Sequence, residues 1–134
     1  MNTPTVSGRQ WLALAATNGL IAVAAGAFAA HGLRHRLDAE SLAIFETAAR
    51  YQMYHALALG LVAALHLAGA APMRPMRVAA IAFTLGILIF SGSLYVYSLT
   101  HWRPAALITP VGGTAFLVGW LMLAVVALGR SRPR

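Results

Sequence analysis

The sequence contains no cysteine, no lysine and only three acidic residues, Asp38, Glu40 and Glu46. The absence of cysteine excludes disulfides, thiolate metal sites and cysteine nucleophiles. The sequence also contains no Ser-His-Asp set, no carboxylate pair suited to acid–base catalysis, no Walker loop and no dinucleotide-binding glycine pattern. We therefore expect no enzymatic activity and no cofactor.

Charged residues of both signs are scarce. They make up 10% of the chain, and 60% of the residues are hydrophobic, whereas soluble domains contain about 25% charged residues. The apolar residues come in four blocks, and a membrane-spanning helix needs about 20 mainly apolar residues. The pattern predicts one all-α domain over residues 1–134, an integral-membrane, antiparallel four-helix bundle. We place its spans at about 11–30, 51–71, 77–99 and 109–128.

The first span is expected to be retained and the second helix to start outside the membrane. The segment 27–29 resembles a signal-peptidase motif, but the apolar run before it exceeds the usual length of about 7–15 residues. Asp38 and Glu40 suit a helix N-terminus, where acids meet the positive end of the helix dipole. No proline occurs between them and Ala71, so this long second helix can run directly into its span.

The fourth helix has two candidate starts. Thr109 is a good N-cap, and Pro110 after it would occupy the favoured first helical position. A start at Pro104 would instead leave Pro110 inside the helix as a kink. The span predicted at 109–128 follows the first of these choices.

The ten arginines give a formal net charge of +7 and flank the apolar blocks. No patch of interleaved basic and aromatic residues accompanies them, so we expect no nucleic-acid partner. With four spans, one side collects six arginines and no acid, and the other collects four arginines and all three acids. The positive-inside bias then favours both termini in the cytoplasm. Arginine without lysine and the abundance of alanine resemble the composition of bacterial proteins, so we expect a location in the bacterial cell inner membrane.

Small residues recur on one face of the first span, at Ala15, Gly19, Ala22, Gly26 and Ala30. Such stripes let helices approach closely in lipid, where hydrophobic attraction between helices is absent. The same spacing of small residues recurs in the third and fourth spans. The glycines expected at helix contacts are Gly19, Gly26, Gly86, Gly112, Gly113 and Gly119. For Gly112 and Gly113, backbone N–H groups presented to an anion are the alternative.

Polar residues concentrate at the span ends that share one side of the membrane, which is the exterior on the orientation above. The opposite half has few, chiefly Asn18, Thr84 and His66. The candidate polar site consists of His31, Glu46, Arg50, Tyr51, His55, Ser91, Ser93, Tyr95 and Thr109. Unpaired polar groups in hydrocarbon cost several kcal/mol each (~2–7), so these side chains must meet water, a partner helix or a cavity.

Glu46 and Arg50 stand four residues apart with the acid first, the favoured order for a helical ion pair. An interfacial ion pair is the simpler interpretation, and a fixed polar site that uses Glu46 as acceptor or proton carrier is the alternative. His55 lies one turn further along the same helix. It is either a packed, hydrogen-bonded side chain or a proton relay or ligand.

Histidine ligation of a metal is a further alternative. His31 and His35 have the spacing of a ligand pair, but Gly32 is expected to break the helix between them. His31, His55 and His101 would be the residues of a redox or metal site. Nothing in the sequence fixes three ligands together, so no metal is expected.

Four motifs resemble one family: GAFAAHGL at 26–33, F-x-T-A-x-x-Y-x-x-x-HALAL at 45–59, FSGSLY at 90–95 and TPVGG-x-x-F-x-x-GW at 109–120. They are similar to the small bacterial membrane proteins of domain of unknown function 423, also called uncharacterised protein family 0382, and to the eukaryotic transmembrane protein 256. Ala29 departs from the expected GAFGAHGL pattern. The resemblance implies a retained first span and a four-helix integral membrane protein, and it implies no catalytic residues.

Three functions remain open at this stage. The first is an accessory or scaffold subunit of a larger membrane complex. It would lie in the lipid bilayer and bind either another membrane protein or a second copy of the chain. The second is a homo-oligomeric channel or carrier for a small solute or proton that uses the polar site. The third is the histidine-based metal or redox protein. Small size, small-residue stripes and the missing catalytic sets favour the first.

Overall fold

The structure, a computed structural model, describes residues 7–129, which are helical apart from short connections and contain no strand. The elements are α1 (Gly8–Phe28), η1 (Ala29–Leu33), α2 (Ala39–Leu67), α3 (Met73–Gly86), η2 (Ile87–Ser91), α4 (Gly92–Thr100) and α5 (Arg103–Leu128). The two η elements are π-helical turns. Because η1 continues α1, and η2 joins α3 to α4, the chain forms four continuous rods. The arginines at 130, 132 and 134, used above to predict orientation, lie outside the described residues.

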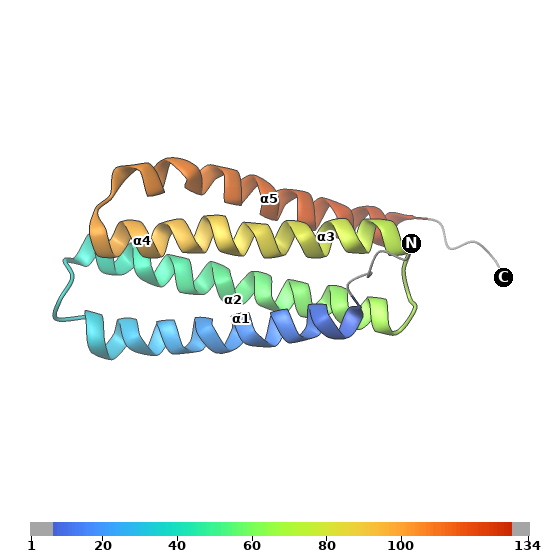
Figure 1. The fold of residues 1–134 in the computed structure, drawn as a ribbon, viewed down its shortest axis with the longest axis horizontal. Helices are drawn as coiled ribbons and strands as arrows, with labels where there is room; N and C mark the ends of the chain where they lie inside the picture. Colours follow the sequence, from blue (N-terminus) through green and yellow to red (C-terminus); the bar gives the residue numbers. More distant parts are fainter. Residues whose placement is uncertain (1–6, 130–134) are drawn as a thin grey trace, which may run out of the picture.

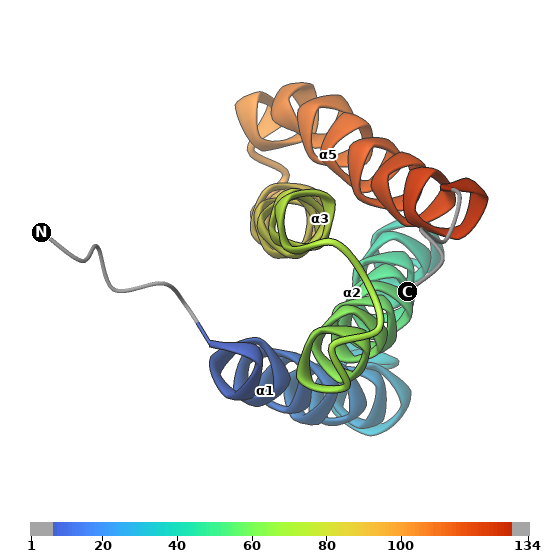
Figure 2. The ribbon, with the colours of Figure 1, turned by 90° about the vertical axis from the view of Figure 1, so that its right-hand side faces the viewer.

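The rods lie side by side, and consecutive rods run in opposite directions (Figure 1). In the end-on view, α1 and α5 lie on opposite outer sides, with α2 and α3 between them (Figure 2). α1 packs against α2, α5 packs against α3, η2 and α4, and α2 also packs against the α3–η2–α4 rod. α2 is therefore the element through which α1 is joined to the rest.

Three rods are long and apolar enough to cross a membrane: Gly8–Leu33, Met73–Thr100 and Arg103–Leu128. α2 is not among them, although it contains 29 residues. Its N-terminal half carries the acid, arginine, glutamine and histidine residues of the stretch 46–55, which lower its mean hydropathy. The all-helical class predicted from the sequence is confirmed.

The start of α2 agrees with the one predicted from the sequence, whereas the start of α5 does not. Asp38 caps α2, its carboxylate accepting from the Ser41 backbone N–H at 2.9 Å and from the Ser41 hydroxyl at 2.8 Å. α5 begins at Arg103 with Pro104 in its first turn and Pro110 inside it, so the N-cap interpretation of Thr109 is wrong. Pro104 is favoured there because first-turn N–H groups need no helical partner.

Gly32 does not end the first helix, contrary to the expectation from the sequence. It lies within η1, and the rod ends at Leu33. A Cβ on Gly32 would meet the ring of Phe28 at 2.5–2.6 Å. The glycine is therefore accommodated by the wider π turn and by the aromatic ring that covers it.

The main core lies where α2, α3 and α5 meet. Its most completely buried large side chains include Leu59, Val62, Met76 and Phe83, which are 0–1% exposed. Phe116 of α5 joins the same core at 4% exposure. Close packing in this layer places the aromatic face of α5 against α2.

Three glycines let α5 and the α3–η2–α4 rod approach closely. A Cβ on Gly86 would overlap the ring of Phe116, and one on Gly119 would meet the ring of Phe83 at 2.5 Å. A Cβ on Gly112 would overlap the backbone of Phe90, which cannot move aside as a side chain can. By contrast, nothing lies within 4 Å of the Cβ position of Gly19 or Gly26.

We expect Gly112→Ala to lower the free energy of unfolding by about 1–3 kcal/mol, because overpacking against backbone forces a helix shift. Gly113→Ala is the matched control. Its Cβ would meet the Phe90 ring at 3.8 Å, an ordinary contact, so it should be neutral or slightly stabilising. Reversible unfolding in mixed detergent micelles measures both, and equal effects would contradict the close contact at Gly112.

Replacement of Asp38 should destabilise the start of α2 in a pH-dependent way. Acceptance of the Ser41 backbone N–H, and then of its hydroxyl, holds the pKa of Asp38 below its usual value. The stabilisation is therefore present above the unfolded pKa of about 3.9 and is lost as the pH falls through the lower folded pKa. Asp38→Ala should lower the melting temperature at pH 7, and this difference should shrink in acid.

Asp38→Asn is the control for this cap, since asparagine accepts from Ser41 without titrating. Its melting temperature should depend less on pH than that of the wild type between about pH 5 and pH 2. Thermal unfolding followed by circular dichroism measures all three proteins. Identical acid profiles for wild type and Asp38→Asn would contradict the assigned role of the carboxylate.

Candidate functional site

His55 lies at the centre of an aromatic cluster between α2 and α5. Its ring stacks on Phe116, with centroids 3.4 Å apart and an interplanar angle of 6°. Tyr51, Phe83 and Trp120 surround it, with ring centroids 5.7–6.2 Å from the imidazole. His55 is only 5% exposed. The residue that the sequence placed one turn inside the span is therefore enclosed by protein.

Hydrogen bonds define the protonation state of this imidazole. The indole Nε1–H of Trp120 lies 3.2 Å from His55 Nε2, and His55 Nδ1 lies 2.7 Å from the carbonyl oxygen of Tyr51. An indole N–H can only donate and a carbonyl can only accept. Nε2 must therefore be the acceptor and Nδ1 must carry the hydrogen. His55 is a neutral imidazole with both nitrogens engaged.

A second polar network joins α1, α2 and α4. Gln52 donates through Nε2 to Oδ1 of Asn18 at 3.0 Å, and it accepts through Oε1 from the hydroxyl of Tyr95 at 2.8 Å. Asn18 donates in turn to the carbonyl of Leu14 at 2.9 Å. Gln52 is 5% exposed. Its amide is thus used on both ends to hold three helical rods together.

Asn18 and Gln52 are the residues that sequence reasoning missed. Asn18 was assigned to the sparse opposite half of the span, yet it bonds to a residue of the candidate site. It lies near the middle of the rod Gly8–Leu33, so either half is within reach of its side chain. The available signal was that Asn18 and Gln52 are the only carboxamide side chains within the predicted spans.

The serines and threonine of the site lie on the α3–η2–α4 rod and on α5. The hydroxyls of Ser93 and Thr109 are 2.7 Å apart and link α4 to α5. Ser93 also donates to the carbonyl of Phe90 at 2.9 Å. Ser91, at the end of η2, is 1% exposed, and its Oγ has no hydrogen-bond partner in the described part of the chain. π turns often occur at functional sites.

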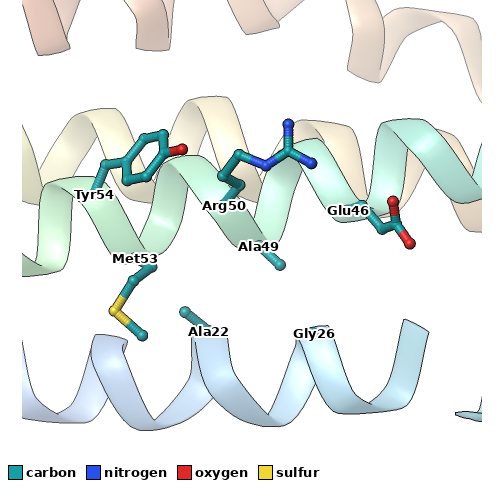
Figure 3. Close-up of a pocket in the computed structure, with 7 residues that line it drawn as sticks. All are labelled: Ala22, Gly26, Glu46, Ala49, Arg50, Met53 and Tyr54. Atoms are coloured by element: carbon teal, nitrogen blue, oxygen red, sulfur yellow. The ribbon is translucent and has the colours of Figure 1, made fainter. Parts of the chain in front are cut away.

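Glu46 and Arg50 do not form the ion pair expected from their spacing. Within residues 7–129 no salt bridge joins them, and Figure 3 shows the Glu46 carboxylate turned away from the Arg50 guanidinium. Both side chains are exposed. They line a hollow of about 400 Å³ between α1 and α2. Exposure removes most of the gain from such a pair, since a surface ion pair contributes only about 0–1 kcal/mol.

The remaining histidines lie apart from this region. His31 is exposed in η1, His35 lies in the following turn, and His101 caps α4 in the left-handed conformation with φ 55°. Residues 7–129 contain no group of three or more histidines and carboxylates placed to hold a metal ion. His31, His55 and His101 are therefore not brought together as one ligand set.

An all-helical chain with three rods apolar enough to cross a bilayer, and with polar side chains bonded between rods, has the features of a small helical membrane protein. The comparisons with known proteins agree. The chain belongs to the family described as "Protein of unknown function (DUF423)", whose family model matches residues 25–113. This confirms the resemblance found in the sequence motifs.

Named relatives cover most of the chain. The UPF0382 membrane protein of Staphylococcus saprophyticus is 45% identical over 86% of this chain and 93% of its own length. The corresponding protein of Haemophilus influenzae is 43% identical over 86% and 90%. The UPF0382 inner membrane protein YgdD of Escherichia coli is 38% identical over 95% of each chain. No solved structure matches the chain.

The Gln52–Tyr95 bond should show energetic coupling between α2 and α4. Hydrogen bonds between membrane helices contribute about 0.6 kcal/mol on average and up to about 1.7. A double-mutant cycle with Gln52→Leu and Tyr95→Phe should give a coupling energy in this range. Unfolding in mixed micelles measures it.

The control cycle pairs Gln52→Leu with Thr109→Val. Thr109 bonds to Ser93 on the α4–α5 contact and shares no hydrogen bond with Gln52. The free energies of these two substitutions should therefore add. A coupling energy as large as that of the Tyr95 cycle would show that the measured value reflects general loosening of the bundle.

Proposed function

We propose that this chain is an antiparallel four-helix bundle in the bacterial inner membrane and serves as an accessory or scaffold subunit of a larger membrane complex. Its spans lie at about 11–30, 51–71, 77–99 and 109–128. Both termini are in the cytoplasm, as the arginine distribution favours. The family membership and the inner-membrane description of YgdD support this location.

The engagement of the buried polar groups is the observation that carries this proposal. His55 uses both ring nitrogens within the protein, and Gln52 uses both ends of its amide. A carrier or proton relay needs groups free to exchange partners during transport. These residues instead bind helix to helix, which favours a structural role over the channel or carrier hypothesis.

The surface that we assign to a partner runs along α2 and α5. One hollow of about 380 Å³ is lined by Tyr51, Tyr54, His55, Phe90, Gly113, Phe116, Leu117 and Trp120. A second, of about 560 Å³, is aliphatic apart from Trp120, which lines both hollows. Exposed tryptophan and tyrosine at the centre of such a surface are typical anchors of protein interfaces.

The partner is a transmembrane helix of another subunit that presents apolar side chains to this surface. Trp120 is 46% exposed although its indole N–H is already bonded to His55. Its outer face is consequently apolar and fixed in orientation, which lowers the entropic cost of binding a second apolar surface. Leu117, 71% exposed beside it, extends the contact area.

Site-specific photo-crosslinking in native membranes tests this function. A benzophenone amino acid at Leu117 should give an adduct with one other membrane protein. The same label at Leu20 of α1 is the control, because Leu20 is equally exposed, at 72%, but belongs to a helix that lines neither hollow of the α2–α5 surface. Trp120→Ala should reduce the Leu117 adduct severalfold, whereas Leu107→Ala, at a site 78% exposed, should not.

The other outcomes have defined meanings. An adduct only between copies of this chain would replace the heteromeric assembly with a homo-oligomer. Equal adducts at Leu117 and Leu20, or none at either position, would overturn the α2–α5 partner surface. Proteoliposome flux that disappears in a His55→Ala variant would favour the carrier hypothesis in place of the scaffold.

A further inference from the structure

The hollow that contains Glu46 and Arg50 is charged at one end and apolar elsewhere. Its other lining residues are Ala22, Gly26, Ala49, Met53 and Tyr54 (Figure 3). In this view Arg50 and Tyr54 extend to one side of α2, whereas Ala49 and Met53 face α1. The floor therefore consists of small side chains and one flexible methionine. The charges of Glu46 and Arg50, which form no salt bridge within residues 7–129, stand at its edge.

A second hollow continues along the same two helices. It measures about 390 Å³, shares Met53, and is lined also by Leu12, Ala15, Ala16, Gly19, Ala56, Leu57 and Gly60. Among the described residues, no charged side chain lines this part. From Glu46 to Gly60 the helix advances by about 21 Å, which exceeds the hydrocarbon thickness of one leaflet, about 15 Å. We call the two hollows together the α1–α2 groove.

We propose that the α1–α2 groove binds one phospholipid with a zwitterionic head group, its phosphate on Arg50 and its ammonium on Glu46. One acyl chain lies along the groove past Met53. This site shares only Tyr54 with the α2–α5 surface assigned to a partner, and Gly26, Glu46 and Arg50 do not line that surface, so the two proposals can fail independently.

Charge complementarity identifies the head group. Glu46 and Arg50 are one helical turn apart, about 5–6 Å between Cβ atoms, and neither charge is neutralised by the other. A head group with adjoining phosphate and ammonium satisfies both charges at once, with charge-assisted hydrogen bonds that are about twice as strong as neutral ones. An anionic head group without an amine would satisfy Arg50 and leave Glu46 next to a negative charge.

The shape of the groove identifies the tail. Nothing lies within 4 Å of the Cβ positions of Gly19 and Gly26, so the floor is open at two places that lie about 10 Å apart along α1. Met53 between the hollows has an unbranched side chain that adapts to irregular surfaces. A flexible chain can follow such a narrow path and fill it without demanding a matching pattern of side chains.

Native mass spectrometry from mild detergent tests the site. The purified full-length chain is incubated with equal amounts of phosphatidylethanolamine, phosphatidylcholine and phosphatidylglycerol. We expect one lipid to be retained per protein, with phosphatidylethanolamine favoured over phosphatidylglycerol by about tenfold. Phosphatidylcholine should fall between them, because its quaternary amine is cationic but cannot donate a hydrogen bond to Glu46.

Substitutions separate the two charges. Arg50→Gln should reduce the retention of all three lipids by about tenfold, since each presents a phosphate to this position. Glu46→Gln should abolish the preference for phosphatidylethanolamine over phosphatidylglycerol. Arg36→Gln is the matched control, because it removes an exposed charge in the turn between η1 and α2 and should change neither quantity.

Gly26→Leu tests the tail. The Cβ position is open, so the new side chain can extend into the hollow and should prevent retention while the melting temperature is maintained. Equal or greater retention of phosphatidylglycerol by the wild type would overturn the proposal. So would lipid selectivity in Glu46→Gln, or lipid retention in Arg50→Gln, that matches Arg36→Gln, and so would retention in Gly26→Leu that equals the wild type.

Discussion

The structure depends on one constraint: polar side chains on the middle of α2 must find their partners inside the protein. A buried polar group without a hydrogen-bond partner is costly. Gln52 reaches α1 and α4, and His55 reaches α5. The one long rod that is not apolar enough to cross a membrane by composition is thus the one that joins the others, and its position at the centre of the arrangement follows from its polar residues.

Glycines that lie against phenylalanine residues determine how α5 packs relative to α2. Gly86 faces Phe116, Gly119 faces Phe83, and Gly112 lies against the backbone of Phe90. These contacts draw α5 onto the α3–η2–α4 rod rather than onto the backbone of α2. Side chains then cover the remaining distance to α2, where Phe116 stacks on His55 and Trp120 bonds to it. The open α2–α5 surface results from this offset.

Three features show how much of the fold and of the candidate site could be predicted from the sequence. The cap of α2 at Asp38 was predictable because capping uses residues three positions apart. The start of α5 was not, because Thr109 and Pro104 both offered acceptable local chemistry and only packing along the whole rod selects between them. The prediction of a Glu46–Arg50 ion pair was wrong for a similar reason. The spacing permits contact, but because both side chains are exposed, an ion pair between them would contribute little free energy.

Composition and the lengths of the apolar runs were sufficient to define a helical membrane protein, because burial of the backbone in lipid leaves few alternatives to helices. The family motifs were likewise visible in the residues. Which polar side chains meet was decided only by the tertiary structure. Asn18, Gln52 and Tyr95 are far apart in the sequence, and their contact depends on the rotation and depth of three rods, which glycine and aromatic packing set together.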